Sequence, residues 1–487
     1  MSFFLEAFSF NFIFLSTIGA ILGIFWGAMP GLSTTMAMAI LVGLSTSFSL
    51  ENALVFILGV FTGSVFGGAI TAILINVPGT PGAVPTQMAG YPLAKKGKAG
   101  EALGIAIFFS MIGNWIGILA LIAFLPSFIA IALKFGSWEM FCLILWGMII
   151  AGTLTSNEKP IKGWISGWLG FLFAIVGRET MFSTPRFTFG LRELMGGIPY
   201  LPVLIGVFGL TEVFIVLKEE NPIGIPQKVG RILPKLKMFF KYGISSIRSG
   251  AIGLLTGIIP GGGANMASFV SYGVGEKITG RNFSEGDLEG VVCSEVANNA
   301  NIGGALLPTL VLGIPGSAPT AAFLAALNLH GVIVGPAIAF NHPGLLEFIY
   351  GTLMVANFAM LISALILIKP SVKLYSLPKS LLMPFIPILC LVGAYALRLS
   401  YFDIFLAFSF GIIGFILRKL KYPLAPLVLG VILGKLADEY LRRTMILYSG
   451  RSTLDLFTTR PIADIIILVI IVTFLFTTSF KSKDTKF

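Results

Sequence analysis

Short segments that combine proline with glycine are the strongest candidates for chemistry in this sequence, because each one interrupts a run of apolar residues. Residues 78–82 hold two prolines and two glycines. Proline lacks a backbone N–H and clashes with the preceding turn, and glycine adds backbone freedom, so a helix should end there. We therefore predict ligand-binding loops built from Pro30, Gly31, Asn76, Pro78, Gly79, Pro81, Gly82, Pro260, Gly261, Gly263, Pro315 and Gly316.

Glycine-rich loops of this kind suit anions. Their successive N–H groups can point at one ligand, and a helix that follows the loop offers its positive end. Neutral donors flank the loops, namely Ser33, Thr34, Thr35, Thr80, Thr86, Asn265, Ser317 and Thr320. Carbonyl groups exposed where a half-helix ends can instead coordinate a cation. The alternative interpretation is an ordinary Pro-Gly turn at a membrane surface.

A second group of candidates is the acid and two amides at Glu295, Asn298 and Asn299. On a helix these positions fall on one face. Inside the otherwise apolar stretch 288–314 such residues are expensive and usually face a cavity. We predict a cation-coupling or proton-accepting site, or support for the Pro-Gly loop that follows. Hydrogen bonding between helices, or a helix end at the membrane interface, is the alternative.

Composition indicates which elements must position these residues. The chain has 487 residues, of which 56% are hydrophobic and only 11% charged, whereas soluble domains have about 25% charged residues. Spans of about 20 residues predict an all-α polytopic membrane protein with about twelve crossings and some re-entrant or broken helices. Three cysteines without a CxxC spacing and two histidines predict no metal site. The sequence contains no GxxxxGK[ST] motif, so direct ATP coupling is not predicted. No basic domain stands apart from the apolar segments, so no nucleic-acid partner is predicted.

Two internal matches predict a duplication. Residues 27–39 resemble residues 257–269 at an offset of 230, and residues 67–82 resemble residues 303–319 at an offset of 236 to 237. We predict a first transmembrane repeat at 1–217, a basic cytoplasmic linker at 218–245 and a second transmembrane repeat at 246–487.

Charge indicates how the two repeats are oriented. In the first corresponding loops, lysine and arginine occur in only one of the two repeats, as inverted repeats require. In a later pair of loops, Lys159 and Lys162 correspond roughly to Lys369 and Lys373 with the same sign. The same charges predict an N-terminus outside the membrane and a basic C-terminal tail inside. This arrangement needs an odd number of crossings, which conflicts with the predicted count of about twelve crossings.

The sequence resembles the large membrane subunit of the tripartite tricarboxylate transporters over nearly its full length. The resemblance rests on FGGAITAILINVPGTPGAVPTQMAGYPLAKKGKAGEAL (66–103), GIIPGGGANMASFVSYGVGEK (257–277), SEVANNANIGGALLPTLVLGIPGSAPTAAFLAALNLHG (294–331), RFTFG (186–190) and APLVLGVILGKLADEYLRRTMILYSG (425–450). It implies that residues 76–86, 260–265 and 313–320 lie near the substrate. The family pattern leads us to expect an acid where Asn265 stands, which puts the coupling ion in doubt.

The resemblance implies secondary uptake of di- or tricarboxylates across the cytoplasmic membrane. It also implies a sodium or proton gradient, a small membrane subunit and an extracytoplasmic solute-binding protein, without an organic cofactor. An ion-independent facilitator or channel is the main alternative. An intramembrane enzyme would need a nucleophile or a metal cluster, and Glu295 has no histidine or cysteine partner in the motif. A receptor-like or scaffolding membrane protein is a third alternative.

Overall fold

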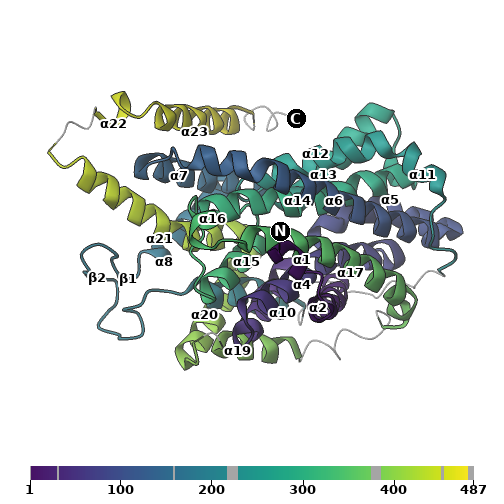
Figure 1. Ribbon diagram of the computed structural model, residues 1–487, viewed down its shortest axis with the longest axis horizontal. Helices are drawn as coiled ribbons and strands as arrows, with labels where there is room; N and C mark the ends of the chain where they lie inside the picture. Colours follow the sequence, from purple (N-terminus) through teal and green to yellow (C-terminus); the bar gives the residue numbers. More distant parts are fainter. Residues whose placement is uncertain are drawn as a thin grey trace.

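The computed structural model describes residues 2–29, 32–156, 159–216, 229–374, 385–396, 398–450 and 455–480. Within these ranges the chain is almost entirely helical, and one small β-hairpin projects at one end of the molecule (Figure 1). The predicted all-α polytopic fold is thereby confirmed.

The helices and strands, in chain order, divide between the two halves of the sequence. The first half contains α1 (Ser2–Glu6), α2 (Phe10–Ala28), α3 (Thr34–Leu44), η1 (Ser45–Ser47), α4 (Leu50–Ile75), η2 (Pro81–Ala83), α5 (Val84–Leu93), η3 (Ala94–Lys98), α6 (Ala99–Ala132), α7 (Ser137–Thr155), α8 (Pro160–Ala174), β1 (Gly177–Arg178), β2 (Pro185–Arg186), α9 (Tyr200–Leu204), η4 (Ile205–Leu210) and α10 (Thr211–Val216). The second half contains α11 (Leu236–Lys241), α12 (Gly243–Ile258), α13 (Gly263–Thr279), η5 (Phe283–Glu285), α14 (Leu288–Leu312), α15 (Ala318–Leu329), α16 (Ile338–Asn341), α17 (Leu345–Leu374), α19 (Phe385–Ala396), α20 (Tyr401–Lys419), α21 (Leu424–Leu447), α22 (Asp455–Thr458) and α23 (Pro461–Phe480).

The number of clear spans is smaller than the predicted twelve. Among the described residues, six segments are long and apolar enough to cross a membrane, and several shorter apolar helices accompany them. The six are Phe10–Ala28, Leu50–Ile75, Pro81–Ala132, Ser137–Thr155, Leu345–Ile368 and Tyr401–Lys419. Some of the remaining helices, such as α8 and α19, are shorter than one crossing, whereas α14 and α21 are long enough but contain charged or polar residues.

Two long helices, α4 and α14, form the centre of the bundle. From Ala53 to Ile75 every residue of α4 is buried, and from Glu289 to Val311 every residue of α14 is buried. A helix that is apolar on all sides is buried on all sides, which accounts for α4. Helix α14 is equally buried although it holds Glu295 and several asparagines, so its polar groups must find partners inside the protein.

Helix α2 runs parallel to α4, and this arrangement makes α2 and α3 a hairpin. Gly19, Gly23 and Gly27 of α2 lie against the backbone of successively later residues of α4, from Phe56 to Ser64. Since glycine has no side chain, the two backbones can approach this closely. Because α2 and α4 point the same way, α3 must carry the chain back to the start of α4. The same parallel packing joins α12 to α14, with α13 returning.

The ends of α4 and α14 match each other at the level of single hydrogen bonds. Asn76 and Gly313, which are 237 positions apart, both end their helices in the left-handed region, with φ of 59° and 67°. One residue later, the Val77 N–H donates to the Thr71 carbonyl and the Ile314 N–H donates to the Pro308 carbonyl, each at 3.4 Å. Each pair of partners keeps the same offset. The two repeats therefore share a backbone design as well as a sequence pattern.

The repeats exchange helices rather than standing side by side. Helix α17 of the second repeat packs on α2 and α4, whereas α6 of the first repeat packs on α12 and α14 (Figure 1). Where the two exchanged helices meet, the Asn114 side-chain amide donates to Asn357 Oδ1 at 3.1 Å, and the rings of Trp115 and Phe358 lie 5.7 Å apart. An asparagine meets an asparagine and an aromatic ring meets an aromatic ring at this contact, which is the pattern that a two-fold axis between two repeats would produce.

Three predicted features fall partly outside the described residues. Pro30 and Gly31 of the first loop lie outside them, as do residues 217–228 at the start of the linker and residues 481–487 of the basic tail. The described part of the linker, 229–245, contains α11 and the first turn of α12.

Candidate functional site

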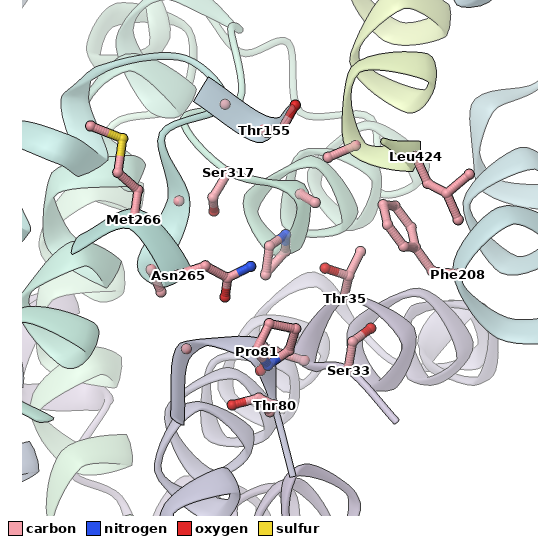
Figure 2. Close-up of a pocket in the computed structure, with 18 of the residues that line it drawn as sticks. Ser33, Thr35, Thr80, Pro81, Thr155, Phe208, Asn265, Met266, Ser317 and Leu424 are labelled. Carbon is pink, nitrogen blue, oxygen red and sulfur yellow. The ribbon is translucent and has the colours of Figure 1, made fainter. Parts of the chain in front are cut away.

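A cavity of about 1190 Å³ lies where the interrupted helices of both repeats meet (Figure 2). The predicted site residues that line it are Ser33, Thr34, Thr35, Pro78, Gly79, Thr80, Pro81, Gly82, Gly261, Gly263, Asn265, Asn298 and Ser317. The other predicted residues that the structure describes do not line the cavity, namely Asn76, Thr86, Pro260, Glu295, Asn299, Pro315, Gly316 and Thr320. The structure therefore brings loops from four distant parts of the sequence into one place.

Helix N-termini are the main feature of this cavity. Helix α3 begins at Thr34, the turn η2 that leads into α5 begins at Pro81, α13 begins at Gly263, and α15 begins at Ala318. All four residues line the cavity. The first N–H groups of a helix have no partner within the helix, and the helix dipole places partial positive charge there. Four such ends around one space make it suitable for anions.

The first repeat contributes hydroxyl groups to the cavity. Ser33 caps α3 by accepting a hydrogen bond from the Met36 N–H at 3.1 Å. Thr35 and Thr80 also line the space, and Figure 2 shows Ser33, Thr35 and Thr80 around its lower wall. Behind them, the Gly79 N–H donates to the Gly68 carbonyl at 3.3 Å and fixes the loop against α4.

The second repeat contributes mainly amides. Asn265 points into the cavity from the start of α13 (Figure 2), and Asn298 and Asn301 line it from α14. Ser317 caps α15 by accepting a hydrogen bond from the Thr320 N–H at 3.4 Å. The Thr320 hydroxyl in turn accepts a hydrogen bond from the Ser317 N–H at 3.0 Å, so it supports the loop without lining the cavity.

The two walls approach each other closely at Gly82. A Cβ atom at this position would lie 2.5 Å from Asn298 Oδ1 and 3.4 Å from Asn265 Oδ1. Only glycine fits between the two amides without displacing one of them. The Gly261 N–H also donates to the Gly316 carbonyl at 3.1 Å, which connects the two loops of the second repeat.

Glu295 lies behind the cavity in a fully buried hydrogen-bond network. The Thr86 hydroxyl of α5 donates to Glu295 Oε1 at 2.5 Å, and the Ser110 hydroxyl of α6 donates to Oε2 at 2.8 Å. The Asn299 amide donates to the Glu295 backbone carbonyl at 2.9 Å. The three predicted polar residues of α14 are thus divided, because Asn298 faces the cavity while Glu295 and Asn299 face α6. Glu295 links three helices just outside the lining.

Charged residues at the rim were not predicted from the sequence. Glu212 of α10, Arg418 of α20 and Lys421, which follows α20, line the cavity. Arg418 Nη1 lies 2.5 Å from Glu212 Oε2. These residues belong to no Pro-Gly motif, and two of them are only a short basic stretch after an apolar helix, which usually indicates a membrane boundary. Tertiary packing alone brings them to the cavity.

A polytopic helical bundle whose interrupted helices meet around one cavity has the architecture of a membrane transport protein. Comparison with known sequences names the family. The chain belongs to the tripartite tricarboxylate transporter TctA family, whose model matches residues 13–429. Membership implies the membrane subunit of a tripartite tricarboxylate transporter.

Two proteins of Agrobacterium vitis are similar to this chain. One, an uncharacterized 52.8 kDa protein in the TAR-I ttuC' 3' region, is 34% identical over 450 residues, which cover 92% of this chain and 89% of the relative. The other, an uncharacterized protein in the TAR-II ttuC' 3' region, is 38% identical over 214 residues, which cover 43% of this chain and 87% of the relative. No solved structure matches the chain.

Proposed function

We propose that this chain takes up di- or tricarboxylates of the citrate type across the cytoplasmic membrane, coupled to a sodium or proton gradient. The observation that carries the proposal is the meeting of four helix N-termini in one cavity. Carboxylates are stabilised by backbone N–H groups and by the positive ends of helices. The volume of about 1190 Å³ is ample for a small polycarboxylate.

Substrate carboxylates bind the backbone N–H groups at the starts of α3, η2, α13 and α15. Hydroxyls of the first repeat and amides of the second orient the molecule, because each can donate to an anionic oxygen. Pro78, Gly79 and Gly82 shape one loop, and Gly261 and Gly316 shape the facing pair. Transport of the bound substrate then requires the cavity to open to one side of the membrane at a time.

Coupling involves Glu295, Asn298 and Asn299. A cation held by carbonyls, hydroxyls and the Asn298 amide offsets the charge of the substrate. Protonation or cation loading at Glu295 changes its bond with Thr86, which lies in the first turns of α5. Since Gly82 and Val84, close to the start of α5, line the cavity, a change at Glu295 is transmitted to the first loop.

The proposed topology has an outside N-terminus and inverted repeats at 1–217 and 246–487. Hairpins α2–α3 and α12–α13 return to the side on which they start, so they make no crossing. Among the described helices, the crossing elements are then α4–α5, α6, α7, α8, α9–α10, α14–α15, α17, α19, α20, α21 and α23, eleven in all. An odd count removes the conflict with an inside C-terminus, and it puts the basic linker on the cytoplasmic side. A small membrane subunit and an extracytoplasmic binding protein complete the transporter.

Uptake measured in proteoliposomes tests the proposal. The chain is reconstituted with its small membrane subunit, and radiolabelled citrate is supplied with the solute-binding protein, with and without an inward sodium or proton gradient. We expect accumulation above equilibrium only with a gradient. Equilibration without any gradient dependence would instead support a facilitator or channel. No uptake or binding of any carboxylate would overturn the proposal.

A further inference from the structure

The charge on the cavity wall is concentrated at one rim. Among the described residues that line the cavity, the charged ones are Glu212, Arg418 and Lys421. Both cations are exposed, whereas Gly79, Thr80 and Gly82 of the first loop are buried. The exposed cations therefore mark one opening of the cavity, and Pro81 and Asn265 on its neutral wall are exposed as well.

The end of α20 holds the two cations at this rim. Lys421 has a positive φ of 62°, which ends the helix, and its N–H donates to the Arg418 carbonyl at 2.9 Å. The Tyr422 N–H closes the turn by donating to the Leu417 carbonyl at 2.8 Å. The C-terminal end of a helix carries partial negative charge, which favours cations there. Arg418 and Lys421 are thus attached to a well-formed helix end.

Arg418 is paired within the protein by an acid that also lines the cavity. Its Nη1 lies 2.5 Å from Glu212 Oε2, and the exposed side-chain fractions are 48% for Arg418 and 14% for Glu212. The Arg418 side chain therefore keeps about half of its surface exposed while it lines the cavity. Arginine has five donors in a planar fork, so it can bind a second carboxylate or exchange one carboxylate for another.

We propose that Arg418 is a specificity-determining residue that binds a carboxylate of the substrate at this rim, and that Glu212 is its built-in competitor. This inference rests on the proposed function of the cavity. When the cavity is empty, Glu212 holds Arg418. A polycarboxylate that enters or leaves offers its own carboxylate to the guanidinium and weakens that ion pair. Substrates with more carboxylates gain more at a cationic rim, which favours di- and tricarboxylates over monocarboxylates.

The proposal predicts that neutral variants of Arg418 and Glu212 change the affinity for citrate in opposite directions. The Kd of citrate is measured by titration calorimetry on the purified chain in detergent, where both sides of the protein are accessible. We expect Arg418→Gln to raise the Kd about tenfold and Glu212→Gln to lower it several-fold, because the first removes a ligand and the second removes a competitor. Arg418→Lys, which keeps the charge but loses the fork, should give an intermediate Kd. Lys419→Gln is the matched control, since Lys419 is exposed and does not line the cavity.

A purely structural ion pair gives a different pattern. Both neutral variants would then weaken binding in the same direction, and the exchanged pair Glu212→Arg with Arg418→Glu would restore it. That result, or an unchanged Kd in Arg418→Gln and Arg418→Lys, overturns the inference while leaving carboxylate binding by the unmodified chain intact. Failure of the proposed function is distinguishable, because the unmodified chain itself would then bind no carboxylate.

Discussion

The two walls of the cavity share a backbone but differ in side-chain chemistry. Thr35 corresponds to Asn265 at the offset of 230, and Phe61 of α4 corresponds to Asn298 of α14 at the offset of 237 that relates the ends of these two helices. The first wall is therefore built from hydroxyl and apolar groups, and the second mainly from amides. The comparison teaches that the two walls break their helices at matching positions but present different side chains to the cavity.

A second difference lies behind the walls. Glu295 of α14 corresponds to Leu58 of α4, and Thr86 of α5 corresponds to Phe323 of α15. All four residues are fully buried. A polar network thus supports the first loop from the second repeat, whereas apolar residues stand at the equivalent places on the other side. Only one of the two equivalent places can titrate or hold a cation, so the coupling we propose is asymmetric.

The largest effects are expected from substitutions at Gly79 and Gly316, which test whether the Pro-Gly loops of the two walls are equivalent. A Cβ at Gly79 would overlap the Gly27 carbonyl oxygen, and one at Gly316 would overlap the Gly257 carbonyl oxygen. Forcing extra atoms into such contacts costs about 1–3 kcal/mol and displaces the loop. We expect Gly79→Ala and Gly316→Ala each to reduce citrate uptake at least about a hundredfold, measured as the initial rate in proteoliposomes.

A helical glycine with free space is the control for this pair. A methyl group added at Gly273 of α13 would meet no other atom within 4 Å, so Gly273→Ala should retain uptake. Loss of uptake in only one of the two loop variants would show that the repeats are not functionally equivalent there.

The asymmetry behind the walls is tested by Glu295→Gln. The amide keeps the shape of the side chain but cannot change its charge, so we expect downhill uptake to continue and gradient-driven accumulation to fall about tenfold or more. Accumulation ratios with and without a gradient measure this. Glu289→Gln is the matched control, because Glu289 lies on the same helix, is also buried, and is hydrogen-bonded to Ser245 away from the cavity. Accumulation that survives in Glu295→Gln would assign Glu295 a structural role only.

The amide and hydroxyl walls are compared directly by Asn265→Ala and Thr35→Ala. A hydrogen bond to a charged group contributes about 1.5–3 kcal/mol, and about 1.4 kcal/mol corresponds to a tenfold change in affinity. We expect Asn265→Ala to raise the KM for citrate about tenfold and Thr35→Ala to raise it less. Asn328→Ala, on an exposed side chain outside the cavity, should leave it unchanged. Asn265→Asp, which introduces the acid that the family pattern suggests, should make uptake more dependent on the coupling cation.

The smallest effect is expected at the two serine caps. Ser33→Ala and Ser317→Ala each remove an N-cap, which costs about 0.5–2 kcal/mol of stability, and each also removes a donor from the cavity. Ser49→Ala and Ser400→Ala remove N-caps of α4 and α20 that do not line it. All four variants should lower the melting temperature similarly, but only the first two should raise the KM, by about threefold. Equal kinetics in all four would show that the caps act through folding alone.

The sequence by itself determined the fold class, the breaks in the helices and the Pro-Gly loop residues that line the cavity. Apolar composition and span length define a helical membrane protein wherever they occur, and proline and glycine end helices for local reasons. The family, too, was evident from long motifs around Gly79 and Pro315, and the match over residues 13–429 confirmed it.

Only the tertiary structure decided how those pieces are combined. The parallel packing of α2 on α4, the exchange of α6 and α17 between repeats, and the arrival of Arg418 and Glu212 at the rim depend on contacts between residues far apart in the chain. The division of α14, with Asn298 facing the cavity and Glu295 facing α5 and α6, is also of this kind. Helical spacing places residues on a face, but the neighbours that surround a helix decide what that face meets.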